Sequence, residues 1–287
     1  MDIKNHNMNK EKPIMRKRFR IIAFLAFFFG IVMAVSQYFE FVSKTVYEES
    51  VSHLTEVFHQ SDNMLGELTH KNLMYLHMWS EYLQDAPSES KIRDYIDKAQ
   101  KDAGFLYFYF LSADGNYKMT TGETGYLGLQ ENTEDEIQKG NDIITNAAVP
   151  GKSQMLVFAS PKAHGSYQGF KYDAIAIAYE NADIVNVLDI SAFNGKAKSY
   201  VLHPDGRVVI DHSLESWGNV YNFFGMLREH TDISEKEILE ISKKFKEGHT
   251  GAMLLNLDGK DYYLVYEKSD IQAVSYTHLR AHETLRH

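Results

Sequence analysis

Hydrophobic positions follow three successive patterns along the chain. From Ile21 to Phe39 the sequence is continuously apolar and carries no charged residue. Across 40–84 the apolar residues recur at spacings of mostly three, four or seven, which is typical of one face of a helix. Beyond Gly104 short apolar and aromatic runs alternate with turn residues, which indicates strands. The pattern therefore predicts a long helix that is apolar at its start and amphipathic afterwards, followed by sheet-rich structure.

The apolar segment 21–39 has the length of a membrane span. Its nineteen residues give roughly 28 Å of helix, close to the ~30 Å hydrocarbon core of a bilayer. The leader 1–20 holds seven basic and two acidic residues, which places it in the cytoplasm and residues 40 onward outside the cell. A buried core helix is one alternative, but core helices of this length usually have a polar face, which this segment lacks. A cleavable signal peptide is the stronger alternative, since Ala34-Val35-Ser36 resembles a cleavage site; we expect an uncleaved membrane anchor.

The helical pattern continues outside the membrane as a stalk. A single helix over 40–84 would extend for roughly 65 Å, and Pro87 marks its end. A second helix is expected over 89–103, with Gly104 in the position of a left-handed cap. We therefore assign 40–103 to stalk and packing helices.

The remaining chain repeats one order of elements. Apolar runs flank Asp-Gly turns in three places, which predicts three hairpins. The expected strands and hairpins cover FLYFYFLSADGNYKMTTG, 154–163, 172–180, 198–213 and GAMLLNLDGKDYYLVYE. The expected helices lie within 134–144 and at 181–190, 219–230 and 234–247. Strand–turn–strand then occurs on both sides of a helical segment. This weak internal repeat divides the body into modules at 104–195 and 196–273.

Composition excludes several classes of function. The chain has no cysteine, so disulfides, thiolate catalysis and cysteine-ligated zinc are absent. Residues 40–273 hold 21 basic and 36 acidic residues, a net charge of −15. Such a body repels anionic lipid and lacks the clustered Lys and Arg of a nucleic-acid-binding protein.

The last residues, AVSYTHLRAHETLRH, resemble translated sequencing-adaptor read-through. His278 and His282 have the i, i+4 spacing of two metal ligands on a helix, but the resemblance removes the reason to assign a site to them. We therefore leave 274–287 out of the fold prediction. The expected consequence is that the native sequence differs after about 273, so that the module at 196–273 is incomplete.

The ordered hairpins after a long anchor helix resemble the double Cache family of extracellular bacterial sensors. The resemblance lies in FLYFYFLSADGNYKMTTGETG, QMLVFASPKA, FKYDAIAIAYENADIVNVLDIS, SYVLHPDGRVVIDHS and GAMLLNLDGKDYYLVYE, and it covers roughly 40–270. It implies an α+β fold: a transmembrane helix, a stalk, and two PAS-like modules with antiparallel sheets, the first distal and the second proximal to the membrane. It also implies small-molecule sensing and signalling at a bacterial cell membrane, as a homodimer through the stalk helix.

The resemblance places the output activity outside these residues. The strands look most like those of hybrid sensor histidine kinases, with diguanylate cyclases and chemotaxis receptors as alternatives. No kinase motif, phosphate-binding loop, zinc-protease motif or nucleophile elbow occurs in the sequence. A stand-alone membrane-anchored binding protein is a further alternative. We expect no catalytic residues and no cofactor within this chain.

A ligand is expected in the distal module, because PAS-like modules bind small molecules between the sheet and its covering loops. The candidate residues supply aromatic faces, hydroxyls and one carboxylate: Tyr107, Tyr109, Tyr117, Thr120, Tyr126 and Asp173. Alternate aromatics on a strand also occur as ordinary core residues, so that interpretation stays open. Amino-acid-binding members of the family carry a Tyr…Arg…Trp-Tyr…Asp arrangement. This chain has no Arg between Arg93 and Arg207 and no Trp between Trp79 and Trp217, which argues against an amino acid bound in that way.

Four histidines on the stalk helix invite a metal interpretation. Their spacing does not support it, because the two that share a face lie about 10 Å apart along the helix. The set comprises His53, His59, His70 and His77. We expect these side chains to lie on a solvated helix face, and we predict no metal site.

Overall fold

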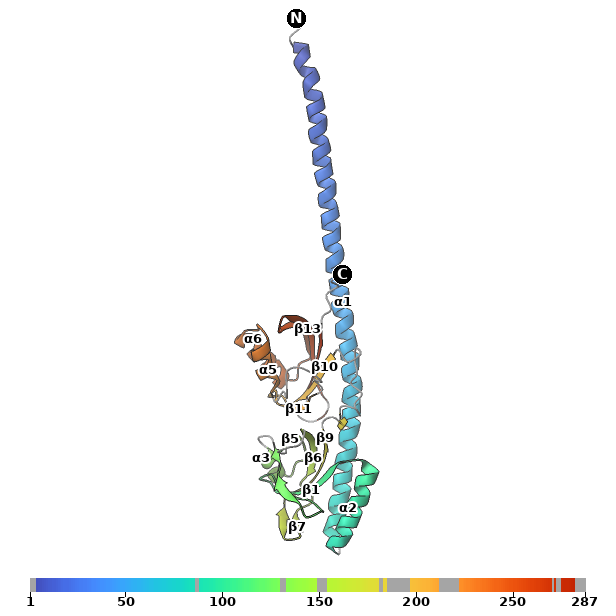
Figure 1. Cartoon of the computed structure of the whole chain (residues 1–287), viewed down its shortest axis with the longest axis vertical. Helices are drawn as coiled ribbons and strands as arrows, with labels where there is room; N and C mark the ends of the chain where they lie inside the picture. Colours follow the sequence, from blue (N-terminus) through green and yellow to red (C-terminus); the bar gives the residue numbers. More distant parts are fainter. Residues whose placement is uncertain are drawn as a thin grey trace. The chain divides into compact units, whose positions relative to one another are not determined.

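The computed structural model describes residues 4–85, 88–129, 133–148, 154–180, 183–184, 197–211, 222–269, 271 and 275–281. The expected α+β class is confirmed: a long apolar-to-amphipathic helix precedes antiparallel sheets (Figure 1). Two compact units are present, 1–52 and 53–287. The expected helix at 181–190 lies almost entirely outside the described residues, where only 183–184 are helical.

Helix α1 (Lys4–Asp85) contains the anchor segment and the predicted stalk. Within the first unit its apolar side chains are exposed, for example Phe24, Phe27 and Phe39. The segment beginning at Phe19 is long and apolar enough to cross a membrane, and its most apolar window is not buried against protein. Exposed apolar surface of this extent is stable in lipid rather than in water.

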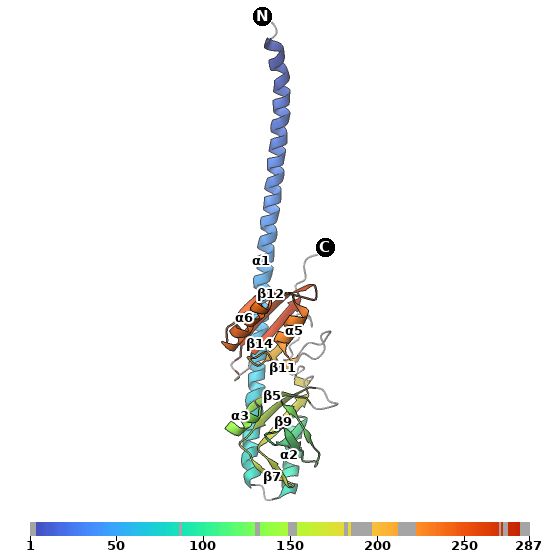
Figure 2. The same cartoon turned by 90° about the vertical axis from the view of Figure 1, so that its left-hand side faces the viewer.

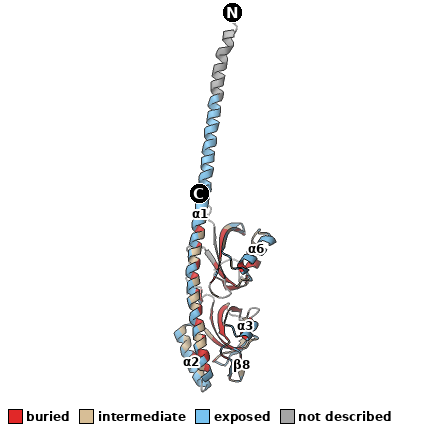
Figure 3. Ribbon diagram, turned by 180° about the vertical axis from the view of Figure 1, so that it is seen from behind, coloured by how far each residue is buried: buried red, intermediate tan, exposed pale blue. Residues whose placement is uncertain are grey.

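From residue 53 onward α1 buries one side. Leu54, Phe58, Leu65, Leu76 and Trp79 have at most 2% of their surface exposed, which gives the red positions on this part of the helix in Figure 3. Their spacings of four, seven, eleven and three place them on one face. The periodic apolar positions that predicted the stalk helix therefore lie on the side of α1 that packs on the sheets.

Helix α2 (Glu89–Ala103) confirms the second predicted helix. It ends at Gly104, whose φ of 77° is left-handed and whose amide donates to the carbonyl of Gln100. This is the C-terminal cap expected from the sequence. Ile96 of α2 is buried in the same cluster as Trp79 and Phe105.

The first sheet is antiparallel and is formed by strands within residues 107–180. Among the described residues it has the order β3-β2-β1-β9-β6-β5-β4. Its strands are β1 Tyr107–Leu111, β2 Asn116–Lys118, β3 Thr124–Tyr126, β4 Gly128–Leu129, β5 Ile143–Ala148, β6 Met155–Ser160 and β9 Ala174–Glu180. Helix α3 spans Thr133–Lys139. Strands β7 Gly165–Tyr167 and β8 Phe170–Tyr172 form a separate hairpin. Strands β1, β9 and β6 are buried along nearly their whole length.

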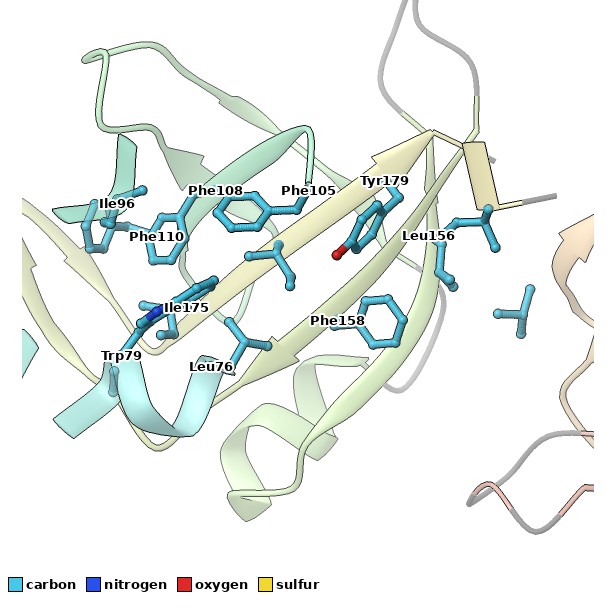
Figure 4. Close-up of a cluster of buried hydrophobic side chains, with 14 of the residues drawn as sticks. Leu76, Trp79, Ile96, Phe105, Phe108, Phe110, Leu156, Phe158, Ile175 and Tyr179 are labelled. Carbon is cyan, nitrogen blue, oxygen red and sulfur yellow. The ribbon is translucent and has the colours of Figure 1, made fainter. Parts of the chain in front are cut away.

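The two faces of this sheet carry different side chains. The helix face, which packs on α1 and α2, is aromatic and branched, with Phe108, Phe110, Phe158, Ile177 and Tyr179 (Figure 4). The opposite face carries tyrosines on β1 and alanines on β9, and Ile137 of α3 packs on it. Because successive side chains of a strand point to opposite faces, each strand contributes to both clusters. We call the second one the tyrosine–alanine face.

The second sheet has the order β11-β10-β14-β13-β12. Its elements are β10 Ala197–Leu202, β11 Val208–Asp211, α5 Phe223–His230, α6 Glu235–Lys246, β12 Gly251–Leu257, β13 Lys260–Lys268 and β14 Ser275–Ala281. Helices α5 and α6 cover the face that carries Tyr200 and Leu202 (Figure 2). The expected capping box is present, with Ser234 and Glu237 bonding each other's backbone amides.

Strand β14 is the main difference from the sequence prediction. Residues 274–287 were left out and the module was expected to be incomplete, yet Ser275–Ala281 pairs with β10 on one side and β13 on the other. The physical reason is that β10 and β13 would otherwise present unpaired backbone groups next to a buried core. The backbone of Ser275–Ala281 pairs with these groups on both sides. Residues 282–287 lie outside the described part of the chain.

Glu267 of β13 provides a pH-dependent contact with α1. Burial raises the pKa of its carboxyl above the usual range; His59 opposes the rise and Asp62 adds to it. A carboxyl pKa that is higher in the folded state stabilises the protein at low pH, and this contribution is lost as the pH rises through the raised value. We expect Glu267→Gln, which is neutral throughout, to raise the melting temperature by about 2 °C near pH 7 and to change nothing near pH 4.

Circular dichroism melts of the full chain in detergent at the two pH values measure this effect. The matched control is Glu56→Gln, since Glu56 is an exposed carboxylate on α1. An equal gain in the control, or a gain for Glu267→Gln that persists near pH 4, would contradict the assignment.

Candidate ligand-binding site

The tyrosine–alanine face is built by pairing large residues with small ones across β1 and β9. The register places Tyr107 opposite Ala178 and Tyr109 opposite Ala176. An alanine side chain ends at Cβ, whereas the neighbouring tyrosine ring extends above the sheet, and Ala176 and Ala178 are fully buried beneath other side chains of this face. On the other edge of β9 the pattern continues, since Ala159 of β6 pairs with Ala176. The face therefore carries tyrosine rings on β1 and only methyl groups on β9. We call the rings of Tyr107, Tyr109 and Tyr117 the tyrosine wall.

Three of the predicted site residues meet in this wall. The rings of Tyr107 and Tyr109 stack with centroids 5.9 Å apart, and the ring of Tyr117 meets that of Tyr109 edge-on at 4.7 Å. Tyr109 and Tyr117 are buried, whereas Tyr107 is half-buried. Gly125 lies directly beside Tyr117 in β3, and a Cβ at that position would meet the Tyr117 hydroxyl at 2.6 Å. The glycine thus makes room for the phenol.

The Tyr109 hydroxyl is a protonated donor at physiological pH. Burial raises its pKa well above the usual range, and the nearby phenols of Tyr117 and Tyr107 and the carboxylate of Glu123 add to the rise. Its one described partner is the sulfur of Met155, at 4.0 Å. A thioether is a weak acceptor, so this hydroxyl retains capacity to donate to a stronger one.

One acidic side chain, that of Glu123, influences this face. Glu123 acts on the buried Tyr109, whereas Lys118 alternates with Tyr117 along β2 and its ammonium donates to the carbonyl of Gln168, 3.0 Å away. A ligand cation on this face would meet ring faces.

Two predicted residues lie elsewhere. Tyr126 is 57% exposed, and because it follows Gly125 in β3 it points to the face opposite Tyr117. Thr120 is buried, but its carbonyl accepts a hydrogen bond from Tyr167, whose ring stacks on Phe110 in the helix-face cluster. The structure thus separates these two residues from the tyrosine wall.

Asp173 has a structural partner. Its carboxylate accepts hydrogen bonds from the Ala113 amide at 2.8 Å and the Ser112 hydroxyl at 3.3 Å, so it fastens the turn between β1 and β2. The sequence offered this carboxylate as a ligand-binding group. In the described structure the same oxygen, Oδ2, makes both turn contacts, and Glu123 is an acidic group that adds to the raised pKa of Tyr109. Sequence analysis missed Glu123 because it lies in a polar turn without a motif.

Comparison with known families gives no match to any family model. No curated protein matches the sequence either. Solved structures do match. The ligand-binding domain of the Pseudomonas aeruginosa amino acid chemoreceptor PctB, in complex with L-Arg, superposes with a TM-score of 0.58 at 13% identity, covering 82% of this chain and 95% of that one.

Two further structures agree. The ligand-binding domain of the P. aeruginosa chemoreceptor PctC, in complex with GABA, has a TM-score of 0.54 at 14% identity, covering 81% and 99% of the two chains. The extracellular domain of the putative histidine kinase mmHK1S-Z2 gives 0.53 at 13% identity, covering 82% and 97%. The fold is that of an extracellular ligand-binding sensor domain. The likeness extends along nearly the whole length of these domains, so both sheets belong to it.

Proposed function

We propose that this chain senses a small molecule outside the cell and transmits the signal through the membrane. The observation that carries the proposal is the combination of the sensor-domain fold with a membrane-length apolar segment on the same helix, α1. The two sheets then correspond to the distal and proximal modules of a double Cache sensor. The basic leader supports a cytoplasmic N-terminus, with the sheets outside.

The output is proposed to be a histidine kinase, with a diguanylate cyclase or a chemotaxis receptor as the alternative. Solved relatives of the fold include both chemoreceptors and a putative histidine kinase. We further propose a homodimer through α1, supported by Met64, Met74 and Met78, which are 37%, 52% and 48% exposed on this helix. Exposed methionines provide adaptable apolar contact surface.

The proposed binding surface is the tyrosine–alanine face, and the proposed ligand class is an amine without a carboxylate. Ring faces attract a cation, and the negative charge of Glu123, which adds to the raised pKa of Tyr109, acts in the same direction. This distinguishes the proposal from the amino acids bound by the chemoreceptors of similar fold.

Tyramine and L-tyrosine test the ligand class directly, because they differ only by the carboxylate. We expect tyramine to raise the melting temperature of the full chain in detergent and L-tyrosine to have a smaller effect or none. A ligand at about a hundred times its Kd stabilises by about 2.7 kcal/mol, which a thermal melt detects. Equal or greater stabilisation by L-tyrosine would show that a carboxylate-binding group is present and would overturn the ligand class.

A pair of tyrosine variants tests the surface. Tyr107→Ala removes a half-buried ring from the wall, and we expect it to weaken tyramine binding about tenfold, the effect of losing about 1.4 kcal/mol. Tyr126→Ala removes an equally large ring from the opposite face and is expected to leave the Kd within about twofold. Isothermal titration of both variants gives the two values. A loss in Tyr126→Ala as large as in Tyr107→Ala would contradict the placement of the site.

A further inference from the structure

Strand β11 of the second sheet contains a bulge. Along β10 the register moves from Ile210 directly to Val208, so Val209 has no residue of β10 opposite it. The buried side chains agree with this register. In a regular strand successive side chains point to opposite faces, yet Val209 and Ile210 belong to one hydrophobic cluster and Val208 to another. A bulge of this kind leaves its extra residue unpaired in the ladder.

The backbone carbonyl of Val209 accepts a hydrogen bond from the first sheet instead. The side-chain amide of Asn146, on β5, donates to this carbonyl at 3.2 Å and to Oε1 of Gln154 at 3.1 Å. An amide group has two hydrogens to donate, so both contacts can be made at once. Asn146 is 7% exposed and Val209 is 1% exposed, so solvent has little access to the bond between the two sheets.

The asparagine and the bulge are complementary. Burial of an amide is costly unless its hydrogens find acceptors, and a carbonyl buried without a donor is costly for the same reason. The bulge in β11 provides an acceptor outside its own ladder, and Asn146 provides the donor. An apolar residue on β5 would leave the Val209 carbonyl without this donor.

Apolar packing also connects the two sheets, but it acts differently. Val209 and Ile210 lie in the same cluster as Phe158 of β6 and Leu65 of α1. Such contacts are non-directional, and they keep the sheets together whatever residue stands at position 146. A hydrogen bond has a preferred length and angle. The bond from Asn146 therefore selects one orientation among those that the apolar contacts allow.

Asn146 also lies directly beside the tyrosine–alanine face. The next residue along β5, Ala147, is fully buried in the cluster of that face, and Asn146 points to the opposite side of the sheet. Because the two residues share a peptide bond, a shift of β5 at Ala147 also moves the amide that holds β11.

We propose that Asn146 and the bulge at Val209 form a joint that fixes the orientation of the second sheet relative to the first. A displacement of β5 then reaches β11 through the joint as well as through α1. Gln154 is a positioning residue, since it holds the second hydrogen of the amide. The joint acts whether or not an amine binds to the tyrosine–alanine face.

A distance measurement between two spin labels tests the joint without any ligand. The chain has no cysteine, so Asp135→Cys on α3 and Lys236→Cys on α6, both at exposed positions, label the two parts specifically. The full chain is measured in nanodiscs by double electron–electron resonance after dilution with unlabelled chain. In Asn146→Ala we expect the population outside the parent's main distance to increase about fivefold, which corresponds to about 1 kcal/mol.

Two further variants at the joint identify the hydrogen bond as the cause. Asn146→Asp keeps the shape of the side chain, but a carboxylate has no hydrogen to donate and would face two acceptor oxygens. We expect it to broaden the distribution at least as much as Asn146→Ala. Gln154→Ala should broaden it less, and it should add nothing when combined with Asn146→Ala, because the two residues act on one bond.

The matched control is Asn72→Ala. Asn72 is also a buried asparagine, but its side chain accepts a hydrogen bond from Tyr179 at 2.8 Å, a contact between α1 and the first sheet. We expect this variant to lower the melting temperature, measured by circular dichroism, and to keep the parent's distance distribution.

The other results would overturn the joint. An unchanged distribution in Asn146→Ala and Asn146→Asp would show that apolar packing alone fixes the orientation. Equal broadening in Asn72→Ala would assign the effect to lost stability. If the variants at position 146 do not fold, Gln154→Ala decides, and a distribution identical to that of the parent would contradict the joint.

Discussion

Replacing Trp79 by alanine is expected to cost about 3–5 kcal/mol of unfolding free energy and to lower the melting temperature by roughly 10 °C. Trp79 is 2% exposed and lies between helix and sheet. Its ring stacks on Tyr75 at 5.6 Å and contacts Phe105 and Phe108 at 5.3 and 5.9 Å. Deleting the indole removes contacts with α1, with the residues before β1 and with β1 itself. The remaining cavity would be lined by rigid rings that cannot collapse into it.

The matched control is Glu81→Ala. Glu81 lies two residues after Trp79 in α1 but is exposed, so its truncation is expected to change the unfolding free energy by about 0.5 kcal/mol or less. Thermal melts of both full-length variants in the same detergent give the comparison. Similar losses for the two variants would mean that α1 does not pack on the first sheet through its Trp79 face.

Gly206→Ala is expected to be the second strongly destabilising change. Gly206 has a φ of 88°, which costs an L residue about 1–2 kcal/mol. In addition, a Cβ there would lie 2.3 Å from Cδ2 of Phe224. Phe224 is 4% exposed in the core of the second sheet and meets Phe245 edge-on, so its ring has no free space to enter. The overlap should add about 1–3 kcal/mol to the backbone strain.

Gly259→Ala separates the two contributions. Gly259 follows an aspartate in the same way and has a similar φ of 78°, but no atom lies within 4 Å of its added Cβ. It should therefore show the backbone strain alone. Chemical denaturation of the two variants measures the difference. A Gly206→Ala variant no less stable than Gly259→Ala would mean that Phe224 does not pack over the turn.

Local signals in the sequence were sufficient for most individual elements. The α2 helix and its glycine cap, the α6 capping box and the three Asp-Gly hairpins depend on residues within a few positions of one another, and all are present. The short β7–β8 hairpin was missed because GSYQGF has no run of alternating apolar residues. Strand β14 was not predicted, because residues 274–287 were left out for their resemblance to an artefact. Its position between β10 and β13 is a property of the whole sheet.

The candidate site was predictable only where it depends on one strand. Tyr107 and Tyr109 share a face because their spacing is two, and this follows from the sequence. The position of Tyr126 depends on the register between β2 and β3, and the role of Asp173 depends on where β9 begins relative to the β1–β2 turn. The contacts of His77 with Asp142 and Lys162 join segments that are distant in sequence. Such pairings are decided by tertiary packing, which no local pattern encodes.

The buried hydroxyls of α1 have a mechanical consequence. Ser61 and Ser80 donate to the carbonyls four residues earlier in their own helix, Val57 and Leu76, so their bonds would survive if the helix slid along the sheet. By contrast, Asn72 accepts from the Tyr179 hydroxyl at 2.8 Å, and this bond, like those of His77, crosses to the sheet. A load along the helix axis would therefore be resisted in shear by the bonds that leave the helix, which also include those of Asp62 with Ser269 and of Gln84 with the Lys162 carbonyl, and not by the bonds of the two serines.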